Sequence, residues 1–192
     1  MNKIAIFASG SGTNAQNIIE YFKTKGTASV SCVLSNKKDA YVLKRAQNYN
    51  IPVRIFERHE FYETDEILNL LNTEGINWIV LAGFLWLVPE NIIDSFTNRI
   101  INIHPALLPK YGGKGMYGLN VHRAVIENND KETGITIHYV NKKYDEGNII
   151  FQTRCRVDES DTPQSLAEKV HKLEYKYYPE IIEKLIQDSS GL

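Results

Sequence analysis

Apolar residues along this chain occur in short runs that alternate with amphipathic stretches. The run at residues 4–8 is unbroken, as expected for a strand that is buried on both faces of a parallel sheet. Residues 15–22 follow, with Ile18, Ile19 and Phe22 at helical spacing. The same alternation predicts further strands at 30–34, 53–56, 78–82 and 100–103, and helices at 40–49, at 63–71 and from near Pro89. Repeated strand–helix–strand units indicate a mostly parallel, twisted sheet with helices on both faces.

The pattern changes in the last third of the chain. Residues 134–140 and 148–157 have the composition of two strands, and a short turn at 145–147 favours an antiparallel pair. A long helix is predicted from Thr162 to about Gln187, because proline is tolerated in a first helical turn. We find no internal repeat, low-complexity segment or linker. The prediction is one α/β domain over residues 1–192, with a Rossmann-like N-terminal half and an antiparallel C-terminal strand pair.

Composition and charge exclude several classes of protein. The chain is 43% hydrophobic and 23% charged, as in ordinary globular proteins. Its net charge of −1 at pH 7 gives no reason to expect nucleic acid or a membrane as the main partner. No apolar stretch is long enough for a leader or a membrane span, and Cys32 and Cys155 lie in apolar runs typical of free thiols. We therefore expect a cytoplasmic protein, and the oligomeric state stays open.

A glycine-rich loop, Gly10-Ser11-Gly12-Thr13-Asn14, lies between the first predicted strand and helix. Glycine lets the backbone approach a ligand, and the free N–H groups of a helix start attract anions. The loop lacks both the lysine of a P-loop and the third glycine of the dinucleotide fingerprint. A phosphate monoester is therefore the ligand that we expect. The loop by itself leaves open the alternative of a tight turn with a capping side chain.

A second candidate site stands at the end of the predicted strand 100–103. Asn102 and His104 have the same parity, so both side chains lie on one side of the strand end. One is an amide donor and the other titrates near neutrality, so together they can hold a carbonyl oxygen while a proton moves. Pro105 ends the strand pairing, because it has no N–H. For this pair alone, a strand cap followed by a polar turn is the alternative.

The longer segment Asn102-Ile103-His104-Pro105-Ala106-Leu107-Leu108-Pro109 resembles the signature Asn-x-His-Pro-Ser-Leu-Leu-Pro of the folate-dependent formyltransferases, and Ala106 is its one departure. The glycine-rich loop resembles the phosphate loop of the branch of that family that acts on glycinamide ribonucleotide. Tyr144-Asp145-Glu146-Gly147 and Glu174, which precedes Pro179, resemble later segments of the same branch. These matches follow one another in order from Ile4 to Pro179.

The resemblance implies transfer of a formyl group from 10-formyltetrahydrofolate, a cosubstrate, to the amine of glycinamide ribonucleotide in purine synthesis. It implies that Asn102 donates to the formyl oxygen, that His104 acts as an imidazolium acid, and that Asp145 raises the pKa of His104. The partners implied are small molecules, with no nucleic acid, no membrane and no tightly bound cofactor. The histidine and cysteine spacings also support no metal site.

The resemblance divides the domain into residues 1–100, a phosphate- and nucleotide-binding half, and residues 101–192, a catalytic and folate-binding half. The implied ribonucleotide-binding residues are Gly12, Thr13, Asn14, His171, Lys172, Leu173 and Glu174. The implied folate-binding residues are Leu85, Trp86, Leu87, Val88, Asn102, Asn141, Lys142, Lys143, Tyr144 and Asp145.

Some positions depart from the family or lie outside its motifs. Trp86 stands where arginine is frequent, so we expect the backbone rather than this side chain to contact folate. Glycine-rich residues 112–118 fall in a stretch that is about five residues longer than the common pattern. They form either a lid or an uninvolved surface loop. We interpret His138 as structural, give His59 no role and place His122 at the rim of the pocket.

Three alternative functions remain at this point. Methionyl-tRNA formyltransferase carries a further C-terminal domain, and formyltetrahydrofolate hydrolase carries an N-terminal regulatory domain. We expect neither, because 192 residues hold only the catalytic domain. A non-enzymatic nucleotide-binding module would keep the phosphate loop but has no reason to keep Asn102, His104 and Asp145 together.

Overall fold

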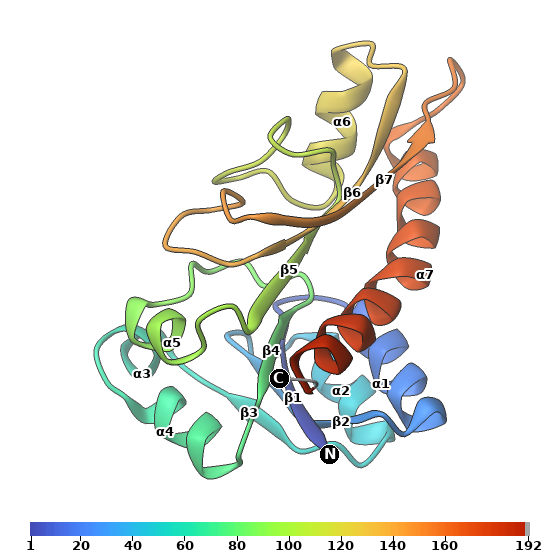
Figure 1. The fold of residues 1–192 in the computed structure, drawn as a ribbon. Coiled ribbons are helices and arrows are strands. Elements are labelled where there is room, and N and C mark those ends of the chain that lie inside the picture. Colours follow the sequence, from blue (N-terminus) through green and yellow to red (C-terminus); the bar gives the residue numbers. More distant parts are fainter. Residues whose placement is uncertain (191–192) are drawn as a thin grey trace.

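The computed structural model describes residues 1–190, whose seven strands form one sheet in the order β3-β2-β1-β4-β5-β6-β7 (Figure 1). Strands β1 to β5 pair in parallel, whereas β6 runs antiparallel to both of its neighbours. The predicted α/β class and the antiparallel pair at the C-terminal edge are confirmed. The strands are β1 (Asn2–Phe7), β2 (Ala28–Ser35), β3 (Val53–Ile55), β4 (Trp78–Leu81), β5 (Ile100–His104), β6 (Glu132–Tyr139) and β7 (Ile149–Arg156).

Helices cover both faces of the sheet, because the strands are apolar on both sides. Ile4 and Ile6 of β1 are in a buried cluster with residues of one set of helices, and Ala5 and Phe7 are in a second cluster with residues of the other set. Within residues 1–190, no helix has both the length and the apolar character needed to cross a membrane. The first set is α1 (Thr13–Lys25), α2 (Tyr41–Asn48) and α7 (Pro163–Ser190); the second is α3 (Arg58–Tyr62), α4 (Glu66–Thr73) and α5 (Glu90–Ser95); α6 (Leu119–Glu127) packs against α7.

The helix predicted over residues 63–71 is wrong in its extent. The chain instead forms the short helix α3 and then α4, with residues 63–65 in neither. Glu57 and Glu60 form a capping box that starts α3. The Thr64 hydroxyl donates to the Glu60 carbonyl at 3.0 Å and accepts from the Glu66 N–H at 3.2 Å. This side chain competes for backbone groups that a continuous helix would use, so it separates the two helices.

The strand order brings three chain segments to one edge of the sheet. Because β1, β4 and β5 are adjacent and parallel, their carboxyl ends lie together. Strand β5 runs one residue further than predicted and so includes His104. On its other side, β6 places His138 directly opposite Asn102 and Thr136 opposite His104. The turn predicted at 145–147 is part of a longer connection from 140 to 148.

Candidate active site

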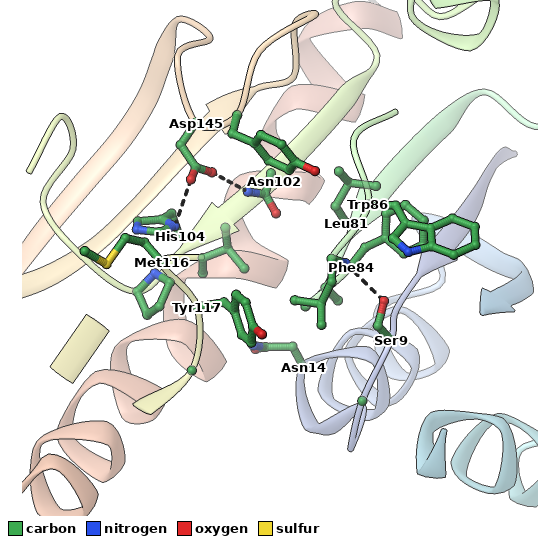
Figure 2. Close-up of a pocket in the computed structure, with 18 of the residues that line it drawn as sticks. Ser9, Asn14, Leu81, Phe84, Trp86, Asn102, His104, Met116, Tyr117 and Asp145 are labelled. Carbon is green, nitrogen blue, oxygen red and sulfur yellow. Dashed lines mark hydrogen bonds and ion pairs between the residues drawn. The ribbon is translucent and has the colours of Figure 1, made fainter. Parts of the chain in front are cut away.

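The loops that follow β1, β4 and β5 line a cavity of about 710 Å³. Residues 113–118, the connection between β6 and β7, and α7 complete its wall. Figure 2 shows Asn102 and His104 close to Asp145, with Asn14 and Tyr117 in another part of the cavity. Most of the predicted site residues line it: Gly12, Thr13, Asn14, Leu85, Trp86, Leu87, Val88, Asn102, His104, Lys143, Tyr144, Asp145, His171 and Glu174.

Four predicted site residues do not line this cavity. On α7, Lys172 and Leu173 are rotated by about 100° and 200° from His171, whereas Glu174 returns to its face. Lys172 is exposed and Leu173 packs against the core. Asn141 Oδ1 instead accepts from the Lys143 N–H at 2.9 Å, and Lys142 pairs with Glu90. Within a segment that resembles the family, therefore, only the side chains that the helix or loop directs into the cavity line it.

The glycine-rich loop at residues 10–14 leads directly into the N-terminus of α1. Gly12 is the N-cap residue and has a left-handed backbone with φ of 74°. A Cβ at this position would lie 2.7 Å from the Cα of Val42, so the close approach of α2 also requires glycine. The first turn of α1 carries no acidic residue. Its free N–H groups therefore face the cavity next to Thr13 and Asn14 without a competing carboxylate in that turn.

Asn14 connects the glycine-rich loop to the C-terminal helix. Its Nδ2 donates to Oε2 of Glu174 at 2.8 Å, and His171 Nε2 lies 4.0 Å from the same oxygen. Glu174 is 5% exposed. Burial raises the pKa of this carboxyl, although the Asn14 hydrogen bond and the charge of His171 act in the opposite direction. Asn14 Oδ1 is buried and lacks a hydrogen-bond partner among the described residues, so it can accept from a bound hydroxyl or amide.

The opposite side of the cavity holds a cluster of polar side chains around Asp145. Asp145 Oδ2 lies 3.5 Å from His104 Nδ1 and accepts from the Gly113 N–H at 2.9 Å. Asp145 Oδ1 accepts from Asn102 Nδ2 at 3.4 Å. Burial alone would raise the pKa of Asp145, but contact with His138 and the charge of His104, each in its protonated form, together with the Gly113 N–H outweigh it and lower the pKa. The carboxylate is therefore ionised at neutral pH and faces the histidine.

Asp145 acts on the pKa of His104 in the expected direction, but burial is the larger effect, and the pKa of this histidine lies below its ordinary value. The side chain of His104 is 4% exposed, and this burial lowers its pKa. Asp145 and the Tyr111 carbonyl act in the opposite direction but do not compensate for burial. The sequence indicated Asp145 as the charged neighbour of His104, but it did not show how deeply the end of β5 is buried. His104 is thus predominantly neutral at pH 7.

His138, interpreted from sequence as structural, belongs to this cluster. Its Nδ1–H donates to the Tyr139 carbonyl at 2.8 Å, which leaves Nε2 free to accept from Asn102 Nδ2 at 3.1 Å. Nε2 also lies 3.5 Å from Asp145 Oδ1. His138 thereby orients the Asn102 amide. The sequence indicated that His138 and Thr136, two residues apart, lie on the same face of a strand. Placing His138 opposite Asn102, however, requires the register between β5 and β6.

Ser9, which sequence reasoning missed, fixes the loop after β4. Its hydroxyl is buried, donates to Asn36 Oδ1 at 2.7 Å and accepts from the Leu85 N–H at 3.0 Å. The indole of Trp86 packs with the rings of Phe56 and Phe61 at centroid distances of 6.0 Å. This side chain therefore stabilises the loop by packing, in place of the charge that the family often has there.

The glycine-rich segment 112–118 forms part of the cavity wall. Gly113, Gly115 and Gly118 have left-handed backbones, with φ of 96°, 89° and 54°. These turns direct Met116 and Tyr117 to the cavity. His122, at the start of α6, lines the cavity as expected, and burial together with the nearby His171 and His104 lowers its pKa to about 4. Residues 113–118 therefore line the cavity, and the interpretation of this segment as a lid stays a prediction.

The arrangement suits transfer of an acyl group to an amine. It combines an ionised carboxylate, a neutral imidazole and an amide within one cluster, and a helix N-terminus without acidic residues in its first turn elsewhere in the same cavity. Within residues 1–190, no three His, Cys, Asp or Glu side chains are grouped so that they could hold a metal ion.

Comparison with known proteins agrees with this chemistry. A family model described as formyl transferase matches residues 2–182. A chloroplast phosphoribosylglycinamide formyltransferase of Arabidopsis thaliana is 38% identical over 97% of this chain, and the chain spans 66% of that protein, slightly under two thirds. The phosphoribosylglycinamide formyltransferase of Haemophilus influenzae is 37% identical over 95% of this chain and 86% of its own length. The crystal structure of the phosphoribosylglycinamide formyltransferase from Anaplasma phagocytophilum has a TM-score of 0.89 at 33% identity, covering 97% of this chain and 87% of that one.

Proposed function

The chain belongs to the formyl transferase family, and on that premise we propose that it transfers the formyl group of 10-formyltetrahydrofolate to the amine of glycinamide ribonucleotide. The products are formylglycinamide ribonucleotide and tetrahydrofolate, in purine synthesis. One observation carries the proposal. A single cavity contains both the anion-binding start of α1 and the Asn102–His104–Asp145 cluster, so a phosphorylated amine and a formyl donor can meet in it.

The amine attacks the formyl carbon and places negative charge on the formyl oxygen. Asn102 is the donor for this oxygen. In the free protein its two amide hydrogens point to His138 Nε2 at 3.1 Å and Asp145 Oδ1 at 3.4 Å. The second contact is the longer and weaker, so it is the one that a formyl oxygen replaces. His138 keeps the first contact and holds the amide in place.

His104 transfers the proton. Because the histidine is neutral, it accepts the proton that the attacking amine loses on addition. It then returns this proton to the folate nitrogen as the carbon–nitrogen bond to the formyl group breaks. No covalent enzyme intermediate forms, and the proton count is unchanged over the cycle. Asp145 stabilises the imidazolium that exists between the two steps, because its carboxylate lies 3.5 Å from His104 Nδ1.

The remaining residues hold the two substrates. Gly12, Thr13 and Asn14 bind the phosphate, and Glu174 with His171 binds the ribose hydroxyls. Leu85 to Val88 form the folate slot with Asp145 and its neighbours Lys143 and Tyr144. In this proposal each substrate contacts residues from both 1–100 and 101–192, so neither of the two proposed halves of the domain binds one substrate alone.

The proposed partners are small molecules alone, and the proposed location is the cytoplasm. A net charge of −1 argues against a polyanionic partner. Cys32 and Cys155 are free thiols, which is usual in a reducing compartment.

The test is a comparison of formyl acceptors. The protein is incubated with 10-formyltetrahydrofolate and, in parallel, with glycinamide ribonucleotide, the dephosphorylated riboside, glycinamide and no amine. Folate absorbance reports the loss of the formyl group. The proposal expects turnover with the ribonucleotide and much slower turnover with the riboside. Equal loss of formyl groups without any amine would instead identify a hydrolase.

A further inference from the structure

Tyr111 contacts His104 through its backbone while its side chain is held elsewhere. Its carbonyl accepts a hydrogen bond from His104 Nε2–H at 2.7 Å. Its phenol donates to Asp130 Oδ2 at 2.9 Å and accepts from Asn128 Nδ2 at 3.0 Å. We propose that Tyr111 is a positioning residue for the reaction, whose anchored phenol holds its carbonyl on His104 and thereby fixes which imidazole nitrogen exchanges the proton.

The backbone of Tyr111 explains why an anchor is needed. Tyr111 has a left-handed conformation with φ of 57°, which is unfavourable for a residue with a large side chain. This conformation turns the carbonyl toward His104. Asn128 and Asp130 follow the end of α6, and Asp130 is also held by Lys110 Nζ at 3.2 Å. The anchoring of the phenol by these residues offsets the strain.

The consequence for His104 follows from the donor and acceptor roles of imidazole. A carbonyl can only accept, so the proton of the neutral ring resides on Nε2. Nδ1 is then the unprotonated nitrogen, and it faces Asp145 Oδ2 at 3.5 Å. Because the Tyr111 carbonyl keeps a proton on Nε2 and the Asp145 carboxylate faces Nδ1, a second proton binds at Nδ1. The other tautomer would direct the lone pair of Nε2 at the Tyr111 carbonyl and leave no base toward Asp145.

The same segment also holds the partner of His104. Gly113 N–H donates to Asp145 Oδ2 at 2.9 Å, two residues after Tyr111. A Cβ at Gly112 would lie 3.3 Å from the Cβ of Asp145, so the segment passes tightly against this side chain. The segment 111–113 therefore sets the position of both members of the His104–Asp145 pair.

The inference rests on the proposed role of His104, and its test has one readout that needs no activity. Nitrogen NMR of the imidazole of His104 in the ligand-free protein reports the tautomer directly, with the signal assigned from His104→Gln. The decisive variant is Tyr111→Phe, which removes only the anchoring hydroxyl. The control is Tyr21→Phe, which removes a phenol that donates to Glu183 Oε2 at 2.6 Å, between α1 and α7.

We expect wild type and Tyr21→Phe to show His104 protonated on Nε2 alone. Tyr111→Phe should show a mixture of tautomers and a lower titration midpoint, because the Tyr111 carbonyl raises the pKa of His104. The other ionisable groups that face this imidazole, Asp145, His138 and His122, are unchanged in both variants. In turnover, kcat should fall about 10-fold, part of the 10² to 10⁴ that a positioned proton-transfer group contributes, with both KM values within twofold.

The inference is overturned if Tyr111→Phe keeps the wild-type tautomer and a kcat within twofold of wild type. If Tyr111→Phe changes the tautomer but wild type transfers no formyl group, the positioning role of Tyr111 stands and the proposed function is refuted. Should Tyr111→Phe fail to fold, Asp130→Ala and Asp130→Asn replace it. The asparagine keeps an acceptor oxygen for the phenol, so it should rescue the tautomer and kcat that alanine loses. Equal behaviour of these two variants would also contradict the inference.

Discussion

Replacing Asp145 by asparagine removes one charge from the cluster and keeps its shape. At neutral pH the carboxylate faces a neutral His104, so the loss costs little before the reaction begins. The cost arises when His104 takes up the proton. A unit charge 3.5 Å from the imidazolium, at an effective dielectric constant of about 20, contributes about 5 kcal/mol. This corresponds to about 10³-fold in rate, and we expect a loss of 10² to 10⁴ in kcat.

The assay is steady-state turnover with each substrate varied in turn. Asp145→Asn should lower kcat and leave both KM values within a few-fold, because the lost interaction exists only after the proton has moved. Asp158→Asn is the matched control, since this carboxylate pairs with Arg156 and Lys169 away from the cavity and its loss should leave kcat within twofold.

The double variant tests whether the two residues act as a unit. His104→Ala should lose as much as Asp145→Asn, and the combined variant should be little worse than either one. A near-wild-type kcat in Asp145→Asn would refute the reasoning, and so would losses that multiply fully in the double variant.

Three further changes have defined outcomes. Asn102→Ala should lower kcat by roughly 10²-fold, about 3 kcal/mol, because the donor to the formyl oxygen is lost; an effect on KM alone in the same assay would contradict this. Gly12→Ala should raise the KM for the ribonucleotide far more than the KM for folate. The reason is that alanine is strained at φ of 74° and its methyl group meets Val42. Comparable rises in both KM values would argue against phosphate binding at this loop. The unfolding free energy, measured by denaturant titration, should fall between pH 6.5 and pH 4, and His122 alone should account for about 3 kcal/mol of the fall, because its pKa is about 4 in the folded protein and near 6.5 in the unfolded one. On acidification the unfolded state binds the proton that the folded state excludes, so this contribution to stability is present above pH 6.5 and is lost as the pH falls. His122→Gln should flatten the dependence of the unfolding free energy on pH. An unchanged pH dependence in this variant would refute the lowered pKa of His122.

The sheet, and most of the residues that line the cavity, could be predicted from sequence because they rest on local patterns. Short, largely apolar runs identified the parallel strands, and the segment from Asn102 to Pro109 carried the signature of the family. The division of the helix predicted at 63–71 could not be predicted in the same way, because it depends on the hydroxyl of Thr64 bonding to two backbone groups.

Other features depended on how segments meet in space. The contact of His138 with Asn102 requires the register of two antiparallel strands. The effect of Asp145 on the pKa of His104 was predicted in the right direction, but the strand pattern does not reveal the burial that outweighs it and lowers the pKa. Lys172 and Leu173 adjoin two residues that line the cavity, yet the rotation of α7 directs them away from it.

In the proposed reaction, the formyl group moves from folate to the ribonucleotide at the cluster around His104. The most direct measurement uses 10-formyltetrahydrofolate labelled with ¹³C in the formyl carbon, and mass spectrometry of the ribonucleotide after incubation with wild type and His104→Ala. We expect labelled formylglycinamide ribonucleotide in amounts equal to the tetrahydrofolate formed, and a severe loss of both products in the variant. Labelled formate in place of a labelled ribonucleotide, or an undiminished rate in His104→Ala, would contradict this proposal.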